Sequence, residues 1–101
     1  MPQSEEQYVF YFKIVYTDRY TDVSVSKNLR INEFIETITP ILKNNLEIPM
    51  ETNIEIVEAG QYHNINGRDA ELAPPLEPSE QTLEQIYGNR HSKTAFYIRL
   101  I

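Results

Sequence analysis

The chain opens with two segments in which apolar and polar residues alternate. Residues 8–17 are rich in β-branched and aromatic residues and lack Gly and Pro, which is typical of a β-strand. Residues 20–26 alternate again, and the polar pair Asp18 and Arg19 separates the two segments, which predicts a β-hairpin. Since alternate side chains of a strand point to opposite faces, the more apolar face should be buried. The expected core residues of the hairpin are Phe10, Phe12, Ile14, Tyr16, Val23 and Val25.

After the hairpin the apolar period changes to three or four residues, which predicts an amphipathic helix over about residues 32–45. Its buried stripe would consist of Ile31, Phe34, Ile35, Ile38, Ile41 and Leu42. We expect Asn32 as the N-cap and Glu33 in the first turn, where the helix dipole favours an anion. Pro40 has no backbone N–H and clashes with the preceding turn, so we expect a kink or a local break near it.

The second half of the chain predicts a strand, a long loop, a short helix and a closing strand. Alternation returns over residues 53–58, and a polar loop with turn signals and prolines follows over residues 62–78. Thr82 is the expected cap of a helical turn near residues 80–87, and residues 94–101 predict the last strand. Hairpin strands combined with a helix indicate an α+β fold, with a mixed sheet of four or five strands packed on one main helix.

This order of elements resembles the ubiquitin-like (β-grasp) family over residues 8–101, which leaves residues 1–7 as a flexible tail. Residues 48–61, which run from Ile-Pro to Ala-Gly-Gln, are similar to the family's third strand and its flanks. Residues 80–87 resemble the family's Thr-Leu-x-x-Tyr turn. The family's modifiers end in Gly-Gly, whereas this chain ends in Arg-Leu-Ile, so we expect no conjugation. The resemblance implies the fold more strongly than the function, because this fold serves many purposes.

The family's main recognition patch lies on the third and last strands and on the first hairpin. The matching positions here are Val57, Tyr97, Arg99, Asp18, Arg19 and Tyr20. The outer face of the sheet is expected to carry Tyr8, Val9, Tyr11, Val15, Val57, Tyr97 and Ile101. Exposed tyrosines suit strands in general, but so many apolar residues on one face favour a docking surface. The expected partner-binding residues are Tyr11, Tyr20, Val57, Tyr97 and Arg99.

Composition excludes several classes of function. The absence of Cys excludes disulfides and thiol catalysis, and it fits a reducing compartment. The net charge is −6 and the 9 basic residues are scattered, so we expect no nucleic-acid binding. No apolar run approaches the length of a membrane span, and the first residues do not resemble a signal peptide. We therefore expect a soluble cytoplasmic or nuclear protein that is neither secreted nor bound to a membrane.

Candidate catalytic and metal-ligating residues are few. His63 and His91 are the only histidines, and neither lies in the spacing of a catalytic or zinc site. Glu77, Glu80 and Glu84 lie in a Pro-flanked polar segment with no apolar pocket to shift a carboxyl pKa. We expect these side chains to be solvated, and we expect no enzymatic activity, no metal and no cofactor.

Two roles remain open at this point. The first is a non-catalytic interaction module that binds a protein through the outer face of the sheet. The second is a structural or accessory subunit of a larger assembly, such as a viral or oligomeric one, held by edge-strand pairing or by the 62–78 loop. The sequence does not identify the partner, and it leaves open whether the chain forms a homo-oligomer.

Overall fold

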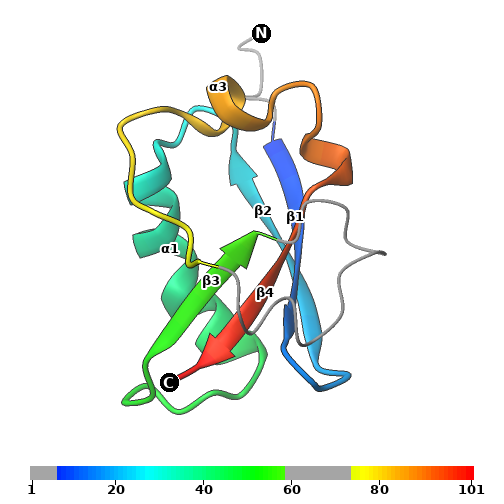
Figure 1. Cartoon of the computed structure of the whole chain (residues 1–101), viewed down its shortest axis with the longest axis vertical. Coiled ribbons are helices and arrows are strands. Elements are labelled where there is room, and N and C mark those ends of the chain that lie inside the picture. Colours follow the sequence, from blue (N-terminus) through cyan, green and yellow to red (C-terminus); the bar gives the residue numbers. More distant parts are fainter. Residues whose placement is uncertain (1–6, 59–73) are drawn as a thin grey trace, which may run out of the picture.

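A four-stranded sheet and one main helix form the fold (Figure 1). The computed structural model describes residues 7–58 and 74–101. Its elements are β1 (Gln7–Ile14), β2 (Tyr20–Ser26), α1 (Ile31–Asn45), β3 (Ile54–Glu58), α3 (Leu83–Tyr87), the 3-10 helix η1 (His91–Lys93) and β4 (Ala95–Leu100). The predicted α+β class and the predicted order of elements are confirmed.

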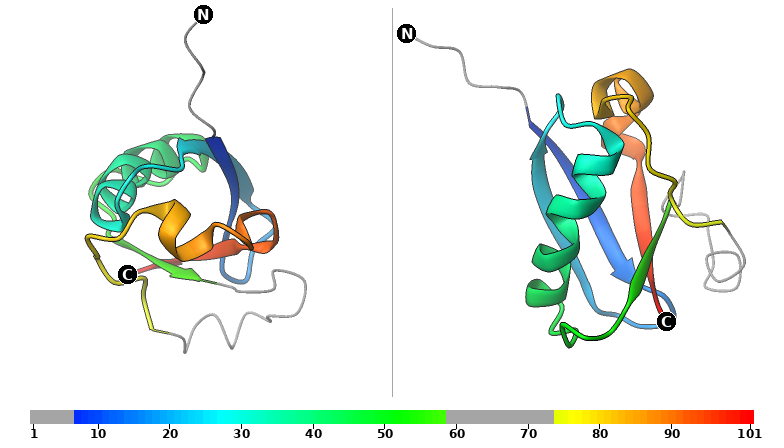
Figure 2. Two further views of the ribbon diagram at one scale, coloured as in Figure 1. Left: turned by 90° about the horizontal axis from the view of Figure 1, so that it is seen from above. Right: turned by 90° about the vertical axis from the view of Figure 1, so that its left-hand side faces the viewer.

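The sheet is mixed, with the strand order β2-β1-β4-β3. The hairpin strands β1 and β2 are antiparallel, β1 and β4 are parallel, and β4 and β3 are antiparallel. The first and last strands therefore lie side by side in the centre, and the two edges belong to β2 and β3. α1 packs across one face of the sheet (Figure 2). On the opposite face, called the outer face below, residues 7–58 and 74–101 place no helix of comparable length.

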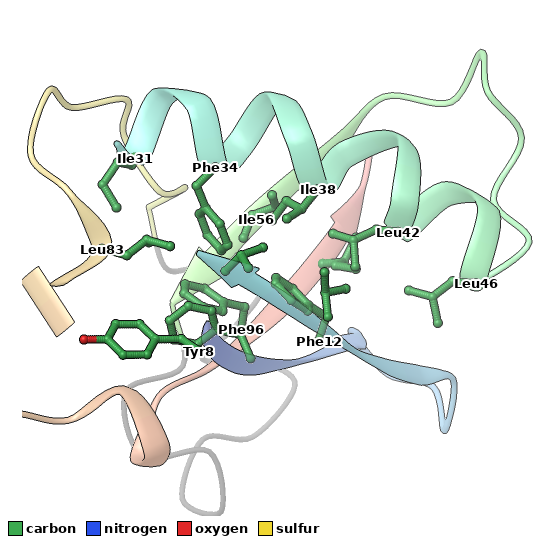
Figure 3. Close-up of a cluster of buried hydrophobic side chains, with 14 of the residues drawn as sticks. Tyr8, Phe12, Ile31, Phe34, Ile38, Leu42, Leu46, Ile56, Leu83 and Phe96 are labelled. Carbon is green, nitrogen blue, oxygen red and sulfur yellow. The ribbon is translucent and has the colours of Figure 1, made fainter. Parts of the chain in front are cut away.

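The core lies between α1 and the sheet and is rich in aromatic rings (Figure 3). Phe10 and Phe12 of β1 approach Phe96 of β4 with ring-centroid distances of 5.4 and 5.2 Å. The ring centroid of Phe34 in α1 lies 5.6 Å from that of Phe10 and 5.8 Å from that of Phe96. Such pairs add to the hydrophobic gain of burial. The predicted core residues that are buried are Phe10, Phe12, Ile14, Val23, Val25, Ile31, Phe34, Ile38 and Leu42.

The prediction that Tyr16 belongs to the core is wrong. β1 ends at Ile14, and Tyr16 is 67% exposed with a backbone φ of 64°. The turn is built by Thr17, whose N–H and hydroxyl both donate to the Ile14 carbonyl, at 3.1 and 2.9 Å. These bonds reverse the chain before the alternation of apolar residues stops.

The prediction that Tyr8 lies on the outer face is also wrong. Tyr8 is 2% exposed, because it shares the inward face of β1 with Phe10. The ring of His91 stacks on the Tyr8 ring at 4.0 Å with an angle of 6° between the planes. His91 is half-buried in this contact, so the solvation predicted for its side chain is only partial.

α1 differs from the prediction at its start and at Pro40. The helix begins at Ile31, so Arg30, not Asn32, is the N-cap, and the Glu33 carboxylate accepts the Arg30 N–H at 3.0 Å. α1 continues through Pro40 to Asn45, so the expected break is wrong. Pro40 lies on the exposed side, where the backbone carbonyl that loses its donor can bond water. Ile41 is also on this side, 37% exposed instead of buried.

α3 is capped by Thr82, as predicted, and is bonded to the end of β3. The Gln85 N–H donates to the Thr82 hydroxyl oxygen at 3.2 Å. At the other end, the Tyr87 hydroxyl donates to Glu58 at 2.9 Å, and Arg90 forms an ion pair with Glu58 at 2.9 Å. Burial, followed by the charge and hydrogen bond of Glu58, raises the pKa of Tyr87. These bonds stabilise the junction between the short helix and the sheet.

Candidate docking surface

The register of the four strands determines which side chains share the outer face. The partners across the strands include Tyr11 with Asp22, Tyr11 with Ala95, Lys13 with Tyr97, and Val57 with Tyr97. Because directly paired residues lie on the same face of a sheet, these side chains all point away from α1. We call the group Val9, Tyr11, Lys13, Tyr20 and Tyr97 the tyrosine face.

Three tyrosines of this face lie close together. The rings of Tyr11 and Tyr20 stack with centroids 5.2 Å apart and 23° between the planes. Burial and, after it, the charges of Tyr20 and Tyr97 raise the pKa of the Tyr11 hydroxyl, which is consistent with the three phenols being neighbours. Tyr11 is 40% and Tyr20 61% exposed, so both rings remain accessible. The structure thus brings together three of the five residues predicted to bind a partner.

Two hollows adjoin in the tyrosine face. The first has a volume of about 510 Å³, and the described residues that line it are Val9, Tyr11, Lys13, Ser92, Thr94, Ala95, Phe96 and Tyr97. The second has a volume of about 260 Å³ and is lined by Lys13, Tyr16, Thr17, Asp18 and Tyr97. Lys13 and Tyr97 belong to both, so they stand where the two hollows meet. Within the described residues, the Lys13 ammonium has no ion-pair partner.

Val57 was predicted to be an exposed part of the site, and this is wrong. Its side chain lies on the outer face opposite Tyr97, yet it is 0% exposed. The outer side of β3 is therefore covered at Val57, whereas the neighbouring Tyr97 of β4 still lines the two hollows. The alternation of a strand indicates to which face a side chain points, but not whether that face is open.

Arg99 is on the outer face, as predicted, but its guanidinium is already held. It forms an ion pair with Glu55 at 2.8 Å, and its side chain is 17% exposed. The two residues face each other across β4 and β3. Arg99 therefore links β4 to β3 through this ion pair, and its charge is largely neutralised before any partner binds. Asp18 and Arg19 of the hairpin turn are both exposed.

Lys13 is a residue of this surface that the sequence did not predict as part of the site. A single Lys between apolar residues usually only marks the solvent side of a strand. Its position between Tyr11 and Tyr97 depends on the parallel pairing of β1 with β4, which no local pattern reveals. The one available signal was that Lys13 is the only cation in residues 8–17.

The remaining candidates add no chemistry to this surface. His63 and most of the 62–78 loop lie outside the described residues. Glu84 forms an ion pair with Lys27 at 2.7 Å, Glu80 forms one with Arg30 at 3.9 Å, and Glu77 is exposed. The described part of the chain holds no group of three or more side chains that could ligate a metal. No helix in residues 7–58 or 74–101 is long and apolar enough to cross a membrane.

Comparisons with protein-family models, with curated proteins and with solved structures give no match to this chain. Its role is therefore inferred from the geometry of its own residues.

Proposed function

We propose that this chain is a non-catalytic, ubiquitin-like module of β-grasp architecture that binds a partner protein through the tyrosine face. The sequence of hairpin, main helix, strand, short helix and strand supports this architecture. The parallel contact between the first and last strands in the centre of a mixed sheet supports it further.

The observation that carries the proposal is the cluster of Tyr11, Tyr20 and Tyr97 on the face of the sheet that also carries Lys13. Tyrosine rings bury a large apolar area on binding, lose little conformational entropy and keep a hydroxyl for hydrogen bonds. Lys13 lines both hollows and has no ion-pair partner among residues 7–58 and 74–101, which favours a partner that brings a carboxylate to the junction of the two hollows. Monomeric proteins rarely expose a contiguous group of apolar side chains that has no binding role.

Capture of binding proteins from an extract of the native host tests this proposal. The bait is the wild-type chain, and the test variant carries Tyr11→Ser and Tyr20→Ser. The matched control is Met50→Ser, because Met50 is an apolar side chain that is 65% exposed away from the tyrosine face. We expect the wild type and the control to retain the same partner and the double variant to lose it, with all three chains folded by circular dichroism. Undiminished capture by the double variant would remove the tyrosine face as the docking surface.

A further inference from the structure

The two edge strands of the sheet differ in whether their outward backbone groups are bonded. In a strand, successive N–H and C=O groups point to alternate sides. On β3 the bond from the Ile101 N–H to the Asn53 C=O fixes the alternation, so Ile54 and Ile56 face away from β4. The Ile56 carbonyl accepts the N–H of Leu76 at 2.6 Å, and Leu76 packs against the core. This edge is therefore partly closed by the chain itself.

The edge of β2 is open. The bond from the Ile14 N–H to the Arg19 C=O, 3.0 Å long, fixes the alternation here. The residues whose backbone groups face β1 are Thr21, Val23 and Val25. Those whose groups face away are Ser26, whose carbonyl already accepts the Leu29 N–H at 3.2 Å, and Tyr20, Asp22 and Ser24. The last three residues are all exposed. In the described chain, the only group that approaches their outward N–H and C=O groups is the Thr21 hydroxyl, 3.4 Å from the Asp22 carbonyl.

We propose that this open edge pairs with β2 of a second copy of the chain, antiparallel and centred on Val23, to form one continuous sheet across a twofold axis. This interface lies at the sheet edge and goes beyond the proposed function, which uses the outer face. Edge strands usually avoid such pairing through Lys, Pro or a bulge. β2 contains no Lys, Arg or Pro, and its one charged residue is Asp22.

The position of Asp22 selects the register. Centring the pair on Val23 aligns the full strand, from Tyr20 to Ser26, and sets Asp22 of each copy opposite Ser24 of the other. Both residues have outward backbone groups, so the two symmetric pairs exchange about four hydrogen bonds. The neighbouring register, centred on Asp22, would set two carboxylates directly opposite each other, which destabilises a strand pair.

The bonded state of the β3 edge explains why assembly ends at two copies. An open β2 edge therefore pairs best with another open β2 edge, since the bond from the Leu76 N–H occupies part of the β3 edge. Pairing of one surface with itself about a twofold axis closes, whereas pairing of two different surfaces extends into a filament. The interface therefore produces a dimer with four strands from each copy.

Sedimentation equilibrium of the wild-type chain at increasing concentrations is the first test. We expect a reversible monomer–dimer equilibrium without larger species. Amide hydrogen exchange at the same concentrations locates the interface, because the outward N–H groups of Asp22 and Ser24 should exchange more slowly as dimer forms. The Val23 N–H, which faces β1, should be protected at every concentration. A chain that stays monomeric throughout, or a dimer without new protection at Asp22 and Ser24, overturns the proposal.

Two charge changes at Ser24 test the register. Ser24→Asp sets two carboxylates against each other across the pair and should weaken the dimer about tenfold, since two symmetric pairs are affected. Ser24→Lys sets an ammonium opposite Asp22 and should tighten it by a similar factor. The matched controls are Ser92→Asp and Ser92→Lys, because Ser92 is an exposed serine of η1, away from the β2 edge. Shifts of the same sign in both Ser24 variants, or equal shifts in the Ser92 controls, contradict the register.

Ser24→Pro removes the outward N–H and leaves the backbone bonds to β1 in place, as edge strands tolerate. We expect this variant to be monomeric with a melting temperature close to that of the wild type. A Ser24→Pro chain that folds and still dimerises through β2 contradicts the proposal. If it does not fold, the opposite shifts of the two charge variants still decide the question.

Discussion

The two faces of the sheet differ in how completely they are covered. Under α1, the inward residues of β1 are at most 2% exposed. On the outer face the same strand carries Val9 at 54% and Tyr11 at 40% exposure. The outer face is itself divided, because Val57 is fully buried on β3 while the tyrosines toward β2 are open. Exposure thus depends on what packs on each part of a face, and only the open part offers a surface for docking.

The largest expected effect comes from the covered face. Phe12→Ala removes a ring that is 0% exposed and packs on Phe96, so it should lower the free energy of unfolding by about 3–5 kcal/mol. Tyr11→Ala, one position away on the open face, should cost about 1 kcal/mol or less. Urea denaturation of both variants measures the difference. Comparable losses would mean that the two faces are not covered differently.

The second prediction compares two valines of the outer face. Val57→Ala should lower the free energy of unfolding by about 2 kcal/mol, because Val57 is fully buried and the loss of its methyl groups leaves a cavity. Val9→Ala makes the same chemical change at a site that is 54% exposed, and should stay within about 0.5 kcal/mol. Equal values from urea denaturation would show that the β3 side of this face is as open as the β1 side.

The contrast between these two valines also separates what the sequence predicts, the face to which a side chain points, from what it does not predict, the exposure of that face. Alternation and helical period correctly predicted the elements, because each pattern reports a face that meets the core. They failed at Tyr16, where two bonds from Thr17 to one carbonyl end the strand early. They failed at Val57 for a different reason, since the cover of a face is a tertiary property that no local pattern contains.

The candidate site was predictable to a similar degree. Tyr11, Tyr20 and Tyr97 were found from alternation and from the resemblance to a known patch. That Lys13 stands between two hollows follows from the register of β1 against β4, which joins residues more than eighty positions apart along the chain. The open edge of β2 likewise becomes visible only once the strand order places β2 at the end of the sheet.

A smaller loss of stability is expected when Tyr87, whose ring is buried in the core, loses the hydroxyl that bonds to Glu58. Tyr87→Phe keeps the ring in the core and removes the 2.9 Å hydrogen bond to Glu58, which Arg90 continues to neutralise. We expect a loss of about 1 kcal/mol in the free energy of unfolding. Tyr20→Phe, at a hydroxyl on the open face, is the matched control and should be close to neutral. An equal effect of the two changes would contradict the assigned role of the Glu58 bond.

The pH dependence of the stability of Tyr87→Phe tests the cause of the raised pKa of Tyr87. Because the pKa of Tyr87 is raised in the folded state above its ordinary value of 10.0, the neutral phenol stabilises the fold. This contribution is fully present below pH 10.0 and is lost as the pH rises toward the folded-state pKa. The advantage of the wild type over Tyr87→Phe in urea denaturation should therefore be constant at neutral pH and decrease above that value. A difference that grows with alkaline pH would have the wrong sign.

The smallest effect concerns two rings of the open face. Burial is the first cause of the raised pKa of Tyr11, and the charge of Tyr20 is the second. Tyr20→Phe keeps the stacked ring and removes the ionisable hydroxyl, so the pKa of Tyr11 should fall toward 10.0 without reaching it. The ring signals of Tyr11 in an NMR titration measure this change, and Tyr16→Phe, at a ring that does not influence Tyr11, is the control. An unchanged Tyr11 pKa in Tyr20→Phe would mean that the two hydroxyls are apart in solution, and the docking surface would then lack the ring pair on which it is built.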